Sequence, residues 1–99
     1  MGDKDKPLSQ AQIAEVLGIR PSTIKYYTQL ALLPYTQNGE RGHKRYDAPA
    51  VQERIELINK LKGDGLTMAS IIKHFSDNEL LEGNPDIYAL SLITGATNG

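Results

Sequence analysis

Apolar residues recur at helical spacing near the start of the chain, and a glycine then interrupts them. Three of them share one face of a helix predicted over residues 10–17, namely Ile13, Ala14 and Leu17. Ser9 suits the N-cap of this helix, and the glutamine three residues later completes a capping box. Gly18 permits the positive φ of a tight turn. A second helix is predicted from Pro21, which suits a first helical position, to about Leu30.

The spacing of Ala14, Gly18 and Ile24 is typical of a helix-turn-helix unit. A small residue lets two helices cross closely, a glycine makes the turn, and a β-branched residue anchors the second helix in the core. Directly after Ile24 the second helix carries a basic and aromatic cluster, Lys25-Tyr26-Tyr27, which favours a nucleic-acid partner. Leu32-Leu33-Pro34 ends this helix.

Two short extended pieces, about 34–37 and 43–46, flank a loop that contains Asn38-Gly39. Asn-Gly with a second glycine nearby is typical of a hairpin loop, and the tyrosines at 35 and 46 suit strands. The sequence therefore predicts a β-hairpin that protrudes after the helix-turn-helix as a wing.

Two further helices are predicted downstream. Asp47 caps the first of them, whose buried face comprises Val51, Ile55, Ile58 and Leu61. Gly63-Asp64-Gly65 ends it, and Thr67 caps the next helix, over about 68–76. The fold class is therefore mainly α: a winged helix-turn-helix with a small two-stranded β-hairpin wing and two further helices.

The chain divides into three parts. Residues 1–7 are expected to be a disordered lead, residues 8–76 the winged helix-turn-helix domain, and residues 77–99 an acidic tail with a short helix over 86–93. The apolar residues of this tail would either dock a neighbouring copy or fold back over the domain's own core. They are Leu80, Leu81, Ile87, Leu90 and Ile93.

Composition excludes several kinds of site. The 99 residues contain no cysteine, which excludes disulfides, thiolate metal sites and iron–sulfur clusters. His43 and His74 are too far apart in sequence for a credible metal pair, and a glycine-rich phosphate loop is missing. We therefore expect no enzyme activity, no cofactor and no metal. No apolar stretch approaches the roughly 18 residues of a membrane span, so we expect a cytoplasmic, nucleoid-associated protein with no membrane partner.

A net charge of −1 conceals an uneven distribution of charge. Residues 20–46 carry five basic residues against one acidic residue, whereas residues 74–99 carry four carboxylates and no lysine or arginine. Small chains often show such blocks by chance. The functional interpretation is that the basic part faces phosphates while the acidic tail faces away.

The second helix and the wing supply the candidate DNA-binding residues. An α-helix fits the major groove, so we expect the exposed end of the second helix there and the wing on the backbone. Lys44 and Arg45 would clamp phosphates, and Arg41 would probe the minor groove. The alternatives are core packing for the helix tyrosines and a charge-protected sheet edge for the wing. The candidates are Arg20, Ser22, Thr23, Lys25, Tyr26, Tyr27, Arg41, His43, Lys44, Arg45 and Tyr46.

The order of these motifs resembles the DNA-binding domain of the MerR family over about residues 8–75. The resemblance rests on the helix-turn-helix followed by Ile24-Lys25-Tyr26-Tyr27, Leu32-Leu33-Pro34, Asn38-Gly39, Arg45-Tyr46 and Gly65-Leu66-Thr67. It implies a winged helix-turn-helix, a second wing-like unit formed by the two following helices, and promoter DNA as the partner, often bound by a dimer. By matching positions it implies a DNA-facing set of Lys25, Tyr26, Tyr27, Lys44, Arg45 and Tyr46.

Two departures from the family pattern matter. Arg20 stands where many members have a serine or threonine cap. Members typically continue into a long dimerisation helix, which Gly83, Pro85 and Gly95 exclude here. The sequence therefore gives no support for an effector-sensing domain.

These observations predict a sequence-specific double-stranded DNA-binding protein, a MerR-like transcription regulator that self-associates on DNA as a dimer or as adjacent copies. Adjacent copies predict direct repeats in the DNA, and a symmetric dimer predicts an inverted repeat. The alternative is an accessory DNA-binding or protein-interaction module, of the kind found in phage, plasmid segregation or recombination, without effector sensing.

Overall fold

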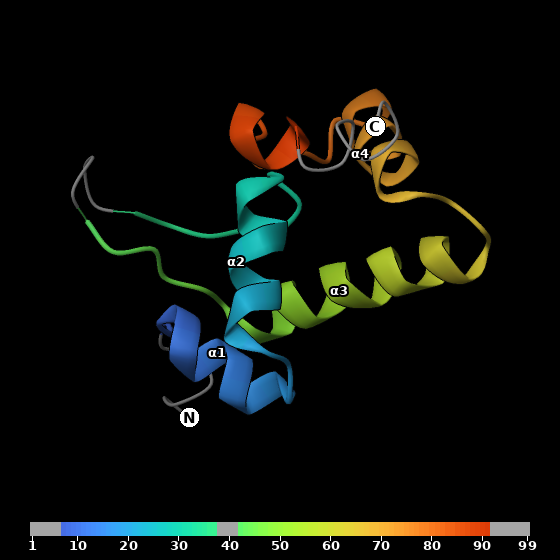
Figure 1. Ribbon diagram of the computed structural model, residues 1–99. Helices are drawn as coiled ribbons and strands as arrows, with labels where there is room; N and C mark the ends of the chain where they lie inside the picture. Colours follow the sequence, from blue (N-terminus) through green and yellow to red (C-terminus); the bar gives the residue numbers. More distant parts are fainter. Residues whose placement is uncertain (1–6, 38–41, 92–99) are drawn as a thin grey trace.

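The computed structural model describes residues 7–37 and 42–91. Its helices are α1 (Gln10–Leu17), α2 (Pro21–Gln29), α3 (Ala48–Gly63) and α4 (Met68–Asp77). α1 packs on both α2 and α3, and α3 packs on α4. Figure 1 shows α3 running from the α1–α2 pair toward α4, while two extended arms project from the opposite side of α2. The described part of the chain is mainly helical, as predicted.

The capping box predicted for α1 is present. The Ser9 hydroxyl accepts from the Gln12 N–H at 3.2 Å, and the Gln12 side chain accepts from the Ser9 N–H at 2.9 Å. Ala14 is buried where α1 meets α2, which lets the two backbones approach closely. The Gln10 side chain also donates to the Pro21 carbonyl at 3.2 Å, which helps to fix the angle between the helices.

Each of the helices α1 to α4 ends in a residue with positive φ, and the residue after it donates a backward hydrogen bond. After α1 this residue is Gly18, at φ 68°, and the N–H of the next residue, Ile19, donates to the Ala14 carbonyl at 2.9 Å. The Gly18 N–H itself donates to the Glu15 carbonyl, which completes a Schellman motif. Gly65 serves after α3, whereas Ala31 and Glu79 adopt the same conformation after α2 and α4.

The core lies between the helices and includes the base of the arms. Its largest fully buried side chains are Tyr46, Phe75, Ile13, Ile24, Leu30, Leu32, Leu33, Ile58, Ile71 and Val51. The predicted apolar face of α3 is buried, and so is the Leu-Leu pair that follows α2.

The two arms are an outgoing arm (residues 33–37) and a returning arm (residues 42–46). Thr36 and Arg45 exchange both backbone hydrogen bonds, at 2.9 and 2.8 Å, and Tyr46 pairs likewise with Leu8 on its other side. These are isolated antiparallel bridges, and none of the described residues belongs to a longer strand, so the predicted two-stranded β-hairpin is not confirmed. The pairing cannot extend toward the body because its next member, Pro34, has no N–H to donate. The predicted Asn38-Gly39 loop lies outside the described residues.

The C-terminal segment (residues 78–91) returns across the end of α2, where a helical turn over 87–91 lies above it in Figure 1. Ala89 is buried, and Leu80, Leu81 and Leu90 pack against the core. Of the two alternatives for the tail, the described part folds back over the domain's own core. Two side chains on this turn, Ile87 and Tyr88, remain 82% and 71% exposed.

The ends of the chain limit two of the expectations. The lead predicted over residues 1–7 lies outside the described residues except for Pro7, and so do Ile93 and the end of the helix predicted over 86–93. Within the described ranges, none of the helices is long and apolar enough to cross a bilayer.

Candidate nucleic-acid interface

The outward face of α2 is built by its register. Ile24, Tyr27 and Thr28 point into the core, which leaves Ser22 and Lys25 exposed. Thr23 is half-buried, and Arg20 is exposed just before the helix. Arg20 occupies the N-cap position in extended geometry but makes no side-chain cap, as the sequence indicated for a residue that cannot accept a hydrogen bond. No described side chain caps this helix start. Pro21 has no N–H, and the Thr23 and Ile24 N–H groups donate to the Arg20 carbonyl, so the Ser22 N–H and the partial positive charge of the helix start remain to attract an anion.

Tyr26 and Tyr27 differ in their surroundings although they are adjacent. Their ring centroids are 5.9 Å apart and the rings are tilted by 39°. Tyr26 is half-buried at the surface, whereas Tyr27 is 5% exposed and belongs to the core. Burial raises the pKa of Tyr26, its neighbour Tyr27 raises it further, and the Lys62 ammonium opposes both. At neutral pH the Tyr26 hydroxyl therefore remains able to donate a hydrogen bond.

The returning arm carries His43, Lys44 and Arg45, and all three are exposed. They border a hollow of about 620 Å³ whose other wall is the first turn of α1. Lys44 reaches back over the Tyr35 ring, with its ammonium 5.3 Å from the ring centroid. The arm thus places its cations beside the start of the first helix of the helix-turn-helix.

Two predicted contact residues are not on the exposed surface. Tyr46 is 1% exposed, and its hydroxyl is bonded to the Thr28 hydroxyl at 2.9 Å inside the core. Tyr27 is buried as well, although its hydroxyl accepts from the Lys62 ammonium at 3.4 Å. Both rings are held by packing from elements far away in sequence, so they support the surface instead of forming it. Arg41 lies outside the described residues.

A second hollow, of about 300 Å³, joins α2 to the arms and to the C-terminal segment. Lys25 and Lys44 line it, together with Tyr35, Asn84 and Asp86. The expectation that the acidic tail faces away from the basic part is wrong for Asp86. The reason is a backbone contact, because the Asp86 N–H donates to the Gln29 carbonyl at 2.6 Å and so brings its side chain to this hollow.

The basic residues of this surface have no acidic partner among the described residues. Among the described residues, the ion pairs are Arg54–Glu82 at 2.9 Å and Lys73–Asp77 at 3.2 Å. The cations that remain without a described carboxylate include Arg20, Lys25, Lys44 and Arg45. No group of three or more potential metal-binding side chains occurs in the described ranges. The surface is therefore suited to an extended anion.

Sequence reasoning missed two residues that shape this surface. Lys62, near the end of α3, touches Tyr27 across 35 positions of sequence. Arg54, on α3, fixes the C-terminal segment through bonds to Leu80 and Glu82 that span 26 and 28 positions. The only local signal for Lys62 is its place in the last turn of a helix, where a lysine also favours the helix dipole. The sequence gave no sign of the role of Arg54, because an arginine at this position does not disturb the helical spacing of apolar residues in α3.

Comparisons with known proteins show which proteins this chain resembles. The family model described as MerR HTH family regulatory protein matches residues 8–78. The mercuric resistance operon regulatory protein of Bacillus cereus is 31% identical over 62 residues, which are 63% of this chain and 46% of that protein. The HTH-type transcriptional regulator AdhR of Bacillus subtilis (strain 168) is 28% identical over 64 residues, 65% of this chain and 45% of that protein. This chain thus spans less than half the length of these curated relatives.

A solved structure is also similar. HiNmlR, a MerR family regulator lacking the sensor domain, was crystallised bound to promoter DNA. It superposes with a TM-score of 0.58 and 27% sequence identity, and the match covers 94% of this chain and 72% of that one.

Proposed function

Since the chain belongs to the MerR family of helix-turn-helix regulatory proteins, we propose that it binds double-stranded promoter DNA and regulates transcription. α2 is the recognition helix, whose exposed start enters the major groove. Residues that contact base edges or phosphates there are Arg20, Ser22, Thr23, Lys25 and Tyr26. Relatives of this chain are transcription regulators, and one similar structure holds promoter DNA, which supports the proposal.

One observation carries the proposal: cations from α2 and from the returning arm border the same hollow. Lys25 and Lys44 are brought together across 19 positions of sequence, and neither has an acidic partner among the described residues. Phosphate contacts position a protein on a duplex, while base contacts give it sequence specificity. The two lysines and the nearby helix start, which has no side-chain cap, support both kinds of contact.

The arms act as the wing of this domain. The Thr36–Arg45 bridge and a hydrogen bond from the Gln37 side chain to the Gly42 carbonyl at 2.6 Å hold the arms together. We propose that Lys44 and Arg45 grip phosphates and that Arg41, which lies outside the described residues, probes the minor groove. Lys62 adds a further cation from α3. The unit formed by residues 8–76 is the DNA-binding domain, and it acts at the nucleoid as a dimer or as adjacent copies.

A second function is favoured by a different observation. Ile87 and Tyr88 are large, adjacent and mostly exposed, which is the chemistry of a protein contact. An accessory module that recruits a partner through this turn, without sensing an effector, is therefore the alternative.

Selection of bound sites from a random duplex pool, at low and at higher salt, tests the proposal. We expect a recovered motif that survives the higher salt, and its repeat symmetry distinguishes a dimer from adjacent copies. Lys25→Ala and Arg45→Ala should weaken binding at least several-fold, whereas Lys73→Ala on α4, whose lysine pairs with Asp77, should not. Binding without any motif that vanishes with salt would overturn sequence-specific regulation and favour the accessory module.

A further inference from the structure

We propose that Asp86 is a specificity-determining residue of the DNA interface, because its carboxylate shares a hollow with Lys25 and Lys44 and repels phosphate there. The inference rests on the proposed DNA-binding function. It assigns a role to the C-terminal segment, which otherwise contributes only to packing.

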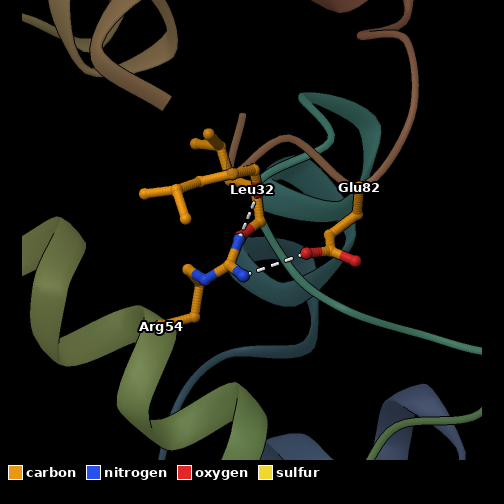
Figure 2. A network of polar contacts seen from close by, with 4 residues as sticks. Leu32, Arg54 and Glu82 are labelled. Carbon is orange, nitrogen blue, oxygen red and sulfur yellow. Dashed lines mark hydrogen bonds and ion pairs between the residues drawn. The ribbon is translucent and has the colours of Figure 1, made fainter. Parts of the chain in front are cut away.

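The segment is fixed firmly enough to hold a charge in place. The Glu82 N–H donates to the Ala31 carbonyl at 2.9 Å, and the Asp86 N–H donates to the Gln29 carbonyl at 2.6 Å. Both carbonyls belong to the end of the recognition helix. Arg54 adds a bond to the Leu80 carbonyl at 2.7 Å. It also donates to the Glu82 carboxylate at 2.9 Å, as Figure 2 shows. The segment therefore moves with α2.

The Asp86 carboxylate is oriented but not neutralised. One of its oxygens accepts from the Tyr88 N–H at 2.8 Å, which caps the helical turn over 87–91. It has no ion pair with a described cation, although Lys25 and Lys44 line the same hollow. The negative charge consequently remains available to act on whatever enters the hollow.

A phosphate in this hollow meets two attractive charges and one repulsive charge. Non-specific binding consists almost entirely of phosphate contacts, whereas a specific complex also gains from base contacts. In a loosely held duplex, phosphates sample the hollow and encounter the carboxylate. In the correct register, base contacts from α2 fix the duplex so that its phosphates meet the exposed cations Arg20 and Arg45, which do not line this hollow, and stay clear of the carboxylate. A fixed repulsive group of this kind lowers the affinity for wrong partners more than for the correct one.

Asp86→Asn tests this role, because asparagine caps a helix as well as aspartate does but carries no charge. The probes are a labelled 30-base-pair duplex of random sequence and a duplex that carries the selected motif, each at low and high salt. At low salt we expect the variant to bind the random duplex about threefold more tightly. This is the effect expected from removing one charge–charge repulsion at a solvent-exposed surface. The gain on the motif duplex should be smaller, and both gains should fade at high salt.

Glu79→Gln is the matched control. It makes the same charge change in the same segment, but Glu79 is not among the residues that line the hollow. Asp86→Ser, another good cap, should reproduce Asp86→Asn, and equal thermal midpoints would show that the turn is intact. Equal effects of Asp86→Asn and Glu79→Gln, or an equal gain on both duplexes, would overturn the inference. Failure of the unaltered protein to bind either duplex would instead overturn the proposed function.

Discussion

Tyr46 and Thr28 form a buried pair that connects the returning arm to the recognition helix. Thr28 donates its single hydroxyl proton to the Ile24 carbonyl at 2.7 Å, so the Tyr46 hydroxyl must donate to Thr28. Burial raises the pKa of Tyr46, the bond to Thr28 partly opposes this, and the neighbouring Tyr35 adds to it. Tyr46 is therefore held neutral in the folded state.

Tyr46→Phe should lower the free energy of unfolding at pH 7 by about 1 kcal/mol, since a buried hydroxyl bond is lost. DNA affinity should change less than twofold, because Tyr46, although it lines the hollow beside Lys25 and Lys44, is only 1% exposed and its hydroxyl is bonded to Thr28. Urea unfolding and a duplex titration measure the two effects. A large loss of DNA affinity with unchanged stability would return Tyr46 to the contact set.

The same tyrosine makes stability depend on alkaline pH. Its pKa is raised in the folded state, so the unfolded chain releases this proton first, near pH 10. The stabilisation is complete below that pH and is lost as the pH rises through the folded-state pKa. Urea unfolding at pH 7, 9 and 10.5 should therefore show a decline above pH 9 that is shallower in Tyr46→Phe. Parallel declines would show that Tyr46 is not the group responsible.

At the residue scale, sequence reasoning succeeded where position alone decides exposure. The register of α2 identified Lys25 as outward-facing and Ile24 as core. It could not place Tyr46, because its burial depends on the Leu8 pairing and on Thr28, 38 and 18 positions away. A contact across such distances leaves no periodic signal.

At the scale of elements, the helix starts were predictable and two of the helix ends were not. Capping side chains at Ser9, Asp47 and Thr67 all make the expected bonds. Glycine marks the ends of α1 and α3, but Ala31 and Glu79 hold positive φ after α2 and α4. At Ala31 the conformation is supported from outside the helix, because its carbonyl accepts from Glu82.

A pair of glycine substitutions isolates this backbone effect. Neither Gly18 nor Gly63 has any atom within 4 Å of an added Cβ, but only Gly18 has positive φ. Gly18→Ala should destabilise the protein by about 1–2 kcal/mol, whereas Gly63→Ala, inside α3, should be neutral or stabilise it by up to about 1 kcal/mol. Thermal unfolding of the two variants compares them directly. Equal shifts would mean that the α1–α2 turn does not need its left-handed residue.

A substitution of Arg54 tests what holds the C-terminal segment in place. Its guanidinium donates to the Leu32 and Leu80 carbonyls and to Glu82, and it lies 5.3 Å from the Phe75 ring centroid. Arg54→Met keeps much of the stem but removes every donor, and should cost about 2–3 kcal/mol. Lys73→Met removes only an exposed ion pair and should cost less than about 0.5 kcal/mol. Amide exchange would show selective loss of protection over residues 80–91 in the arginine variant. Unchanged protection there would contradict the role of Arg54 in holding this segment.

At the scale of the whole molecule, the division of charge was readable from the sequence, but its arrangement in space was not. Arg20, Lys25, Lys44 and Arg45 are exposed at the start of α2, on α2 and on the returning arm, while α3 carries three further basic residues. The acidic tail reaches the edge of this surface because Arg54 and the end of α2 draw the segment back. The net charge of −1 is therefore the sum over the whole chain and does not describe the surface proposed to bind DNA.

The salt dependence of DNA binding reports how much of this surface is used at once. If every basic residue assigned to the described interface neutralises one phosphate, the slope of log affinity against log salt is about −4.5 for one copy and about −9 for two. These residues are Arg20, Lys25, Lys44, Arg45 and Lys62. Lys25→Ala should make the slope shallower by about 1 per bound copy, whereas Lys73→Ala should leave it unchanged. A slope near −2 that is the same in Lys25→Ala would show that α2 is not part of the interface. A slope near −9 would show that two copies bind each site.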